Sequence, residues 1–331
     1  MATSALSLVP STITAAPLTQ SRARLQTKAR LIQLTAGSAY RIYVNSLAPS
    51  GRRAMVTLLD QCVLLLGHQG PAEQFNWDQL TFEKAHLIRS SLVELGYAVS
   101  TTNMMLAALR GVTKAAFNLG HMDADTMLRI NSVKSLKGNA VRTGRRLSTE
   151  DTQKLLASCE DLSCPAKRDR DKAILLIGIG AGLRCTEICS LNRDDLDEEQ
   201  GLLRVREGKG RKQRQIYLAE TVQSALKAWL QHRGSAPGAV FTRILKSSVV
   251  TEDKLTSNGL SHALKNLQQQ ANISAFTPHD LRRTFITRLL EEGIDLNTVR
   301  QLAGHSDVST TVRYDKRDLE WQKSASRSIV V

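Results

Sequence analysis

A short segment near the C-terminus, Thr277 to Phe285, combines a helix start with two side chains that bind anions. Thr277 and Pro278 are a typical N-cap and first helical residue, so His279 and Arg282 should project from one face of the helix that follows. The positive end of this helix adds its own attraction for an anion. The segment therefore predicts a site for a phosphate group.

Two further residues with possible chemical roles follow. His305 comes 23 residues after Arg282, at the end of a short predicted helix, and Tyr314 comes nine residues later. Each has an ordinary structural explanation when taken singly, because histidines cap helices and a tyrosine can pack with its hydroxyl on a neighbour. A functional interpretation depends on whether these residues act as a set.

Two earlier segments complete such a set. Arg184 lies in the segment GLRCTEI (182–188), and Lys209 lies between glycines in the turn of a predicted hairpin. With these additions the chain resembles the tyrosine recombinases, or phage integrase family. Their catalytic domain has arginine in a G-[LM]-R-x-x-E-[LI] setting, lysine on a hairpin, H-x-x-R, then G-H and a nucleophilic tyrosine. All five elements occur here in that order, and the resemblance covers residues 147–317 by motif and 36–130 by pattern only.

The resemblance implies a site that attacks a phosphodiester with Tyr314. A phosphodiester is a poor electrophile because its negative oxygens repel a nucleophile, and many enzymes offset this with divalent metals. The sequence offers no carboxylate cluster for Mg²⁺, so we expect neither a metal nor a cofactor. Arg184 and Arg282 would instead grip the non-bridging oxygens and neutralise charge that develops in the transition state.

The resemblance also implies roles for the remaining residues. His279 would accept or relay the proton of Tyr314, and His305 would donate a hydrogen bond to a phosphate oxygen. Lys209, a point charge at a hairpin tip, suits protonation of the departing 5′ hydroxyl. The product would be a 3′-phosphotyrosyl bond, which a 5′ hydroxyl of another strand can attack without ATP. Exchange of strand pairs in this way would pass through a four-way junction.

Some residues near the motifs have structural interpretations. Arg283 stands where many relatives have histidine, and we expect this departure to lie outside the catalytic set. Glu187 should support the helix that carries Arg184, and the apolar residues Ile174, Leu175, Ile177 and Ile179 should form core.

The pattern along the chain predicts a mainly α-helical protein of two domains. Residues 1–34 are interpreted as a disordered basic arm, 35–130 as an all-helical core-binding domain and 131–147 as a basic linker. Residues 148–317 are expected to form a mixed, mostly helical catalytic domain with a small antiparallel sheet, and we hypothesise that residues 318–331 are a tail that docks on another subunit. The resemblance implies that the two domains close on DNA as a C-shaped clamp.

The local signals for individual elements are specific. Helices are expected over 82–95, with Thr81 as N-cap, over 102–119, and over 171–180. A capping box at Ser148 and Asp151 should begin a helix that runs to about residue 159. The clear strand pair is 202–206 with 213–218, joined by a turn that contains glycines.

The charge favours DNA as the partner. A formal net charge of +14 and a pI of about 9.8 point to a polyanion. Contacts in the first domain are expected from Arg52, Arg53, Asn103, Arg110 and Lys114, and in the linker from Arg142, Arg145 and Arg146. The alternative for each of these residues is that it lies on a solvated helix face or in a solvated linker and does not contact DNA. The resemblance implies double-stranded recombination sites as substrate, a homotetramer on DNA, and a possible accessory host protein that bends DNA.

Other functions stay open from sequence alone. A type IB topoisomerase uses a similar residue set, a non-catalytic DNA-binding regulator would keep the fold, and a metal-dependent nuclease is the weakest alternative.

The Ser/Thr-rich first residues could also pass for a transit peptide. No apolar run is long enough to span a bilayer, so we expect a soluble protein. Its expected location is the cytoplasm of a bacterial host, where it acts on DNA. The five cysteines are expected to be reduced, with Cys185 and Cys189 a poor metal pair.

Overall fold

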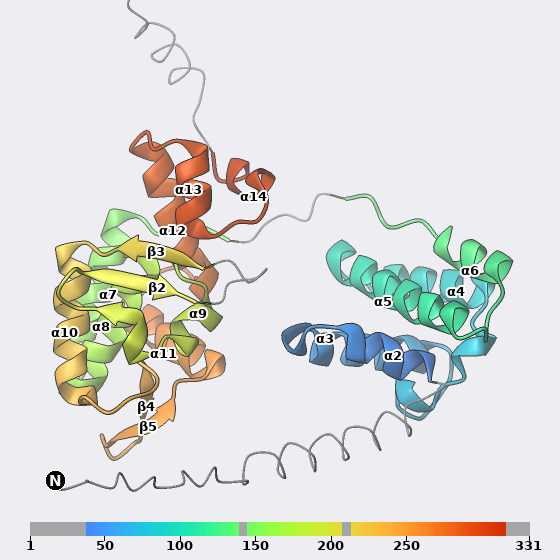
Figure 1. Cartoon of the computed structure of the whole chain (residues 1–331), viewed down its shortest axis with the longest axis horizontal. Helices are drawn as coiled ribbons and strands as arrows, with labels where there is room; N and C mark the ends of the chain where they lie inside the picture. The colour runs from blue at the N-terminus through green and yellow to red at the C-terminus, as the bar shows by residue number, and fades with distance from the viewer. Residues whose placement is uncertain (1–37, 139–143, 207–212, 316–331) are drawn as a thin grey trace, which may run out of the picture. The chain divides into compact units, whose positions relative to one another are not determined.

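The computed structural model describes residues 38–138, 144–206 and 213–315, and its chain divides into two compact units (Figure 1). Unit 1 is Met1–Val141 and unit 2 is Arg142–Val331. Several predictions lie outside the described residues: the arm at 1–34, the tail at 318–331, and the proposed roles of Arg142 and Lys209.

The regular secondary structure among the described residues of unit 1 is all helical. Its helices are α2 (Ala39–Ser46), α3 (Pro49–Leu65), α4 (Phe82–Glu94), α5 (Val99–Asn118) and α6 (Ala124–Asn131), with two 3₁₀ turns, η1 (Ala72–Gln74) and η2 (Trp77–Gln79). The long helix α5 is central, because α2, α3, α4 and α6 all pack against it. Its buried face includes Met105, Leu109 and Val112, which belong to the core of the unit.

The caps explain where these helices begin and end. The hydroxyl of Thr81 accepts a hydrogen bond from the backbone N–H of Lys84, and Gly96 adopts a left-handed φ of 72° after α4. The N-cap at Thr81 was expected from the sequence. Helix α5 begins three residues earlier than predicted, at Val99, although its N-cap, Ala98, has no side chain that can cap.

Unit 2 combines helices with two small antiparallel sheets. Its helices are α7 (Thr149–Glu160), α8 (Pro165–Gly180), α9 (Cys185–Ser190), α10 (Glu220–Arg233), α11 (Ser257–Gln270), α12 (Pro278–Glu291), α13 (Leu296–Ala303) and α14 (Val308–Val312), with one 3₁₀ turn, η3 (Arg193–Asp195). One sheet has the order β1 (Leu196–Asp197), β2 (Leu202–Val205), β3 (Arg214–Tyr217). The second pairs β4 (Thr242–Ile244) with β5 (Val250–Lys254). The prediction of a mainly helical fold with a small antiparallel sheet is confirmed.

Helix α8 organises the core of unit 2. It contacts α7, α10 and α12, and its residues Ile174, Leu175, Ile177 and Ile179 are buried as predicted. The predicted helix at 171–180 was too short at its N-terminus, because α8 begins at Pro165. The first turns carry charged residues that hid the helical period, and two of them, Arg170 and Asp171, form a buried ion pair.

The second sheet was missed in the sequence. Residues of β4 and β5 are mixed in polarity, and β5 has an intermediate-to-exposed burial pattern that gives no alternation to detect. The capping box that starts α7 was predicted correctly, since Ser148 and Asp151 exchange hydrogen bonds between side chain and backbone. No described helix is both long enough and apolar enough to cross a membrane.

Candidate active site

The N-terminal turn of α12 places His279, Arg282 and Arg283 at one site. Thr277 is the N-cap, Pro278 is the first helical residue, and the Asp280 carboxylate accepts a hydrogen bond of 2.9 Å from the backbone N–H of Thr277. This capping box fixes the start of the helix, and with it the direction of the side chains that follow. Asp280 is therefore a structural acid within the site.

Two glycines supply the carbonyl groups that hold the two motif arginines. Nη1 of Arg282 donates to the carbonyl of Gly182 at 2.7 Å, and Nη2 of Arg184 donates to the carbonyl of Gly304 at 3.0 Å. Both glycines have positive φ values, 60° and 63° respectively. Arg282 also donates to the carbonyl of Ala303. A guanidinium has five N–H donors, so each arginine keeps donors for an anion.

The carboxylate of Glu187 holds Arg184 from the other side. Glu187 accepts hydrogen bonds from the backbone N–H of Arg184 at 2.8 Å and from its Nη1 at 2.7 Å. Arg214, on β3, donates to both carboxylate oxygens at 3.1 and 2.8 Å. Burial opposes ionisation of Glu187, but the hydrogen bonds from Arg214 and Arg184 prevail and lower its pKa to about 2. The predicted structural role of Glu187 agrees with these contacts, while Arg214 was not singled out in the sequence.

Tyr314 lies beside both histidines, just beyond the end of α14. Its hydroxyl is 3.2 Å from Nε2 of His279, and its ring is nearly parallel to that of His305, with centroids 6.1 Å apart. Tyr314 is buried and packs in a small apolar cluster with residues of α12 and α13, including Phe285 and Val299. The hydroxyl group thus meets a candidate base within the pocket.

These side chains line one open pocket. The lining residues are Arg184, His279, Arg282, Arg283, His305, Ser306, Thr310, Arg313 and Tyr314. Five of the six predicted catalytic residues are therefore brought together, and the sixth, Lys209, lies outside the described residues. Arg283 and Arg313 were missed as pocket residues. The only sequence signal for these two residues was their position, since Arg283 follows the motif residue Arg282 and Arg313 precedes Tyr314.

The pocket is strongly positive, and this shifts the titration of its histidines. Burial and the charges of Arg282 and Arg184 lower the pKa of His305 to about 4. Loss of solvent around the ring, followed by the charges of Arg282 and Arg283, also lowers the pKa of His279. His279 is therefore neutral near pH 7 and able to accept a proton. Nδ1 of His305 contacts Oγ1 of Thr311 at 2.9 Å, which leaves Nε2 as the nitrogen for a ligand.

Burial lowers the pKa of Arg282 to about 9, with a smaller contribution from the charge of Arg184. Two cations this close are mutually unfavourable, and a bound anion would relieve the repulsion. Among the residues that the structure describes, no group of three or more His, Cys, Asp or Glu side chains could hold a metal ion. The arrangement is suited to binding an anion such as a phosphodiester.

Most predicted DNA contacts in unit 1 have intramolecular partners. Asn103 exchanges hydrogen bonds of 3.1 and 2.8 Å with the backbone of Leu136, and Arg110 donates to the carbonyl of Val133 at 2.6 Å. Arg52 donates to three backbone carbonyls at the end of α2, those of Val44, Asn45 and Leu47. Arg53 and Lys114 are exposed. Residues 133–136 therefore pack on α5 and are not a free linker.

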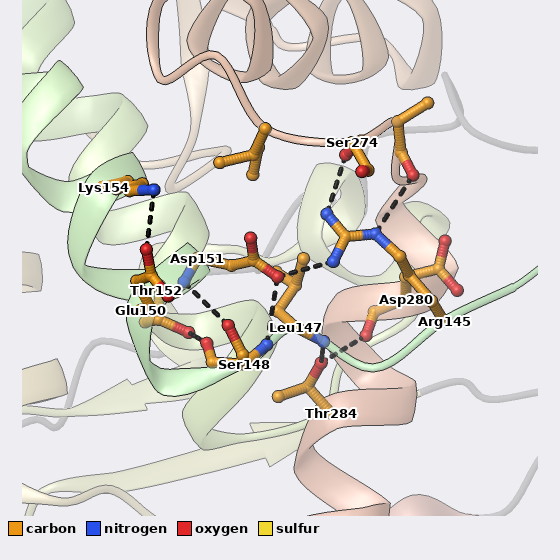
Figure 2. A network of polar contacts seen from close by, with 12 residues as sticks. Arg145, Leu147, Ser148, Glu150, Asp151, Thr152, Lys154, Ser274, Asp280 and Thr284 are labelled. Atoms are coloured by element: carbon orange, nitrogen blue, oxygen red, sulfur yellow. Dashed lines mark hydrogen bonds and ion pairs between the residues drawn. The ribbon is translucent and has the colours of Figure 1, made fainter.

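The end of the predicted linker is fastened to unit 2 (Figure 2). Arg145 forms an ion pair with Asp151 at 2.5 Å and donates to the carbonyl of Ser274 at 2.7 Å, while Oγ1 of Thr284 accepts from the backbone N–H of Leu147 at 2.9 Å. Arg146 pairs with Glu291. These contacts attach residues 145–147, at the end of the predicted linker, to unit 2.

Comparisons with known proteins agree with this fold and site. The phage integrase family profile matches residues 145–320. The chain is 33% identical over 230 residues to the tyrosine recombinase XerA of Thermococcus kodakarensis. The aligned region covers 70% of this chain and 75% of that protein. The chain is 34% identical over 223 residues to the tyrosine recombinase XerD of Listeria monocytogenes, covering 66% and 72%.

Solved structures show the same fold. A Tn1549 transposon integrase in complex with a circular intermediate DNA matches with a TM-score of 0.67 and 18% identity, covering 88% of this chain and 99% of that one. A lambda integrase dimer bound to a core site matches with a TM-score of 0.62 and 16% identity, covering 91% and 88%.

Fold, site and relatives together define a tyrosine-type site-specific DNA recombinase. The chain belongs to the phage integrase family. The sequence-based prediction of the family is confirmed, and the comparisons do not favour the topoisomerase or regulator alternatives.

Proposed function

We propose that Tyr314 cleaves DNA by attacking a phosphodiester held between Arg184 and Arg282. The observation that carries this proposal is the 3.2 Å contact between the Tyr314 hydroxyl and Nε2 of His279, inside a pocket lined by both arginines. The Oη–P bond forms while the P–O5′ bond breaks. The proton of Tyr314 passes to His279, which is neutral because its pKa is lowered.

The arginines and His305 supply the electrostatic part of the reaction. Arg184 and Arg282 are fixed by carbonyl and carboxylate groups, so their remaining donors need little rearrangement when charge develops on the phosphate oxygens. Loss of one such preorganised donor costs a factor of about 10² to 10³ in rate. His305 adds a hydrogen bond through Nε2.

Lys209 is proposed as the general acid that protonates the leaving 5′ oxygen. An ammonium group suits this role because it can give up a proton, whereas a guanidinium scarcely does so. The glycines on either side of Lys209 support its place in a turn. Its test is a DNA substrate with a 5′ bridging sulfur, because a thiolate departs without a proton. K209A should cleave this substrate at nearly the wild-type rate, and failure to recover would reassign the acid.

The 3′-phosphotyrosyl bond retains the energy needed for rejoining, so a 5′ hydroxyl from a second duplex can attack it and release Tyr314. We propose that two such exchanges, through a four-way junction, recombine double-stranded sites held by a homotetramer. The two units would close on DNA as a C-shaped clamp, an accessory host protein could bend the site, and the tail at 318–331 would dock on a neighbouring subunit. The proposed location is the cytoplasm of a bacterial host.

We also propose the domain boundaries given above and a set of residues that contact DNA. Arg53 and Lys114 are the strongest contact candidates in unit 1, since both are exposed. Arg52, Asn103, Arg110, Arg145 and Arg146 would have to bind phosphate with the donors that their intramolecular partners leave free. Arg142 is proposed as a DNA contact from the sequence alone, because it lies outside the described residues. Phosphate contacts of this kind give an affinity that falls steeply with salt.

The proposed cleavage is tested with a nicked suicide DNA site, in which the cleaved end diffuses away and the covalent complex accumulates. Wild-type protein should form an adduct in the presence of EDTA, and Y314F should bind the site without forming one. Adducts in Y314F would assign the attack to another residue, and loss of wild-type activity in EDTA would point to a metal.

A further inference from the structure

Arg283 lies over the aromatic ring of Tyr314. Its guanidinium carbon is 5.2 Å from the ring centroid, which is within the range of a cation–π contact. Only 17% of the Arg283 side chain is exposed, so water screens this contact less than it would at the surface. The residue that departs from the family pattern is thus next to the candidate nucleophile.

The surroundings of Arg283 restrict where its guanidinium can lie. Nε is 3.5 Å from Oδ1 of Asp280, whose side chain is buried and whose other oxygen caps α12. On another side the chain passes at Gly144, where an added Cβ would lie 2.8 Å from Nη2 of Arg283. The guanidinium is therefore confined between a fixed carboxylate, a backbone segment and the Tyr314 ring.

Side-chain contacts place the ring of Tyr314, and besides Arg283 they come from His279, His305 and the apolar cluster that includes Phe285. Helix α14 ends at Val312, and the backbone N–H of Tyr314 makes one hydrogen bond, of 2.9 Å, to the carbonyl of Thr311. The position of the ring consequently depends on side-chain contacts, and Arg283 provides a charged contact to it from the rigid first turns of α12.

We propose that Arg283 is a positioning residue that holds the phenol ring of Tyr314 in the pocket, ready for attack, through its cation–π contact. Arg283 acts through Tyr314 and does not grip the scissile phosphate. This inference rests on the proposed role of Tyr314 as nucleophile. It adds a residue that places the nucleophile in the pocket.

The direct test uses ¹⁹F NMR of protein labelled with 3-fluorotyrosine at its five tyrosines. The Tyr314 resonance is identified by its loss in Y314F. In R283Q this resonance should move toward the shift of an exposed tyrosine, whereas R283K should give an intermediate shift. R288Q is the matched control, because Arg288 lies on the same helix but donates to Thr152 at 3.2 Å. It should leave the resonance in place.

The kinetic test is single-turnover cleavage of the suicide site. R283Q should cleave roughly 3- to 30-fold more slowly, the range of a cation–π contact, with DNA affinity within about twofold of wild type. R283K should recover part of the rate. If wild type forms no adduct, the proposed function fails. If wild type cleaves and R283Q matches it with an unmoved resonance, this inference alone is wrong. Weaker DNA binding with an unmoved resonance would also overturn it, because Arg283 would then contact phosphate.

Discussion

Nη2 of Arg184 donates a hydrogen bond of 3.0 Å to the carbonyl of Gly304, a residue 120 positions away in the chain. The carbonyl is available because Gly304 ends α13 in a left-handed conformation, with φ 63° and ψ 45°. The same glycine leaves room for Arg214, whose Nη1 would be 2.8 Å from an added Cβ. One small residue therefore orders two arginines at the site.

We predict that G304A destabilises the protein more than G293A does. Both glycines have positive φ, 63° and 82°, but an added Cβ at Gly293 meets no atom within 4 Å. G293A should cost about 1–2 kcal/mol in the free energy of unfolding, the backbone penalty alone. G304A should cost about 1 kcal/mol more, because Arg214 must move. Chemical denaturation of the two variants measures the difference, and equal losses would contradict the contact.

We predict that E187Q lowers the free energy of unfolding near neutral pH. We also expect this free energy to vary less with pH in the acidic range than it does in wild type. The pKa of Glu187 in the folded protein, about 2, lies below its ordinary value of 4.5, so its contribution is complete above pH 4.5 and is lost as pH falls toward 2. The full contribution is about 3 kcal/mol. The stabilities of wild type and E187Q, measured by denaturation, should therefore approach each other as pH falls from 4.5 and converge only near pH 2.

The control for that experiment is E291Q. Glu291 also pairs with an arginine, Arg146, but both side chains are about half exposed, at 49% and 51%. An exposed pair contributes about 0–1 kcal/mol, so E291Q should be nearly neutral. A loss in E291Q as large as that in E187Q would show that burial of the pair is not what matters.

The acidic limb of the pH profile of kcat/KM for cleavage should lie below pH 6.5. His279 must be neutral to accept the proton of Tyr314, and its pKa in the free protein is lowered by partial burial and by Arg282 and Arg283. Because kcat/KM reports the free enzyme, it should fall only as pH drops below this lowered pKa. In R283Q the limb should move upward, since one neighbouring charge is gone. A wild-type limb above pH 6.5 would argue against His279 as the base.

R282K should reduce cleavage by a factor of about 10² to 10³ while leaving much of the DNA affinity. Arg282 is 1% exposed and donates to two backbone carbonyls, and a lysine ammonium cannot reproduce this geometry and still reach the phosphate with a paired contact. Single-turnover cleavage and a binding titration separate the two effects. Equal losses of rate and of affinity would indicate that Arg282 only binds DNA.

Much of this site was predictable because its elements carry local signals. The Thr277-Pro278 start of α12 and the glycine at 304 fixed the helix ends that position His279, Arg282 and His305. The six-residue set could be recognised because its motifs resemble those of the phage integrase family in type and order. The family followed from this resemblance and the mainly helical fold from the helical periods along the chain, and both are confirmed.

Other features depended on contacts between distant segments, which spacing does not encode. Nothing in the sequence showed that Arg214 would share Glu187 with Arg184, or that Arg283 would lie over Tyr314. Asn103 and Arg110 were predicted to contact DNA from their polarity, but their side chains bind the backbone of residues 133–136. The β4–β5 pair escaped detection because its strands lack alternation.

The most direct test of the account is to map the covalent bond between protein and DNA. Wild-type protein trapped on a suicide site is digested with nuclease and protease, and the nucleotide-bearing peptide is sequenced by mass spectrometry. We predict a nucleotide joined through its 3′ phosphate to Tyr314. A nucleotide on any other residue, or one joined through a 5′ phosphate, would contradict the mechanism.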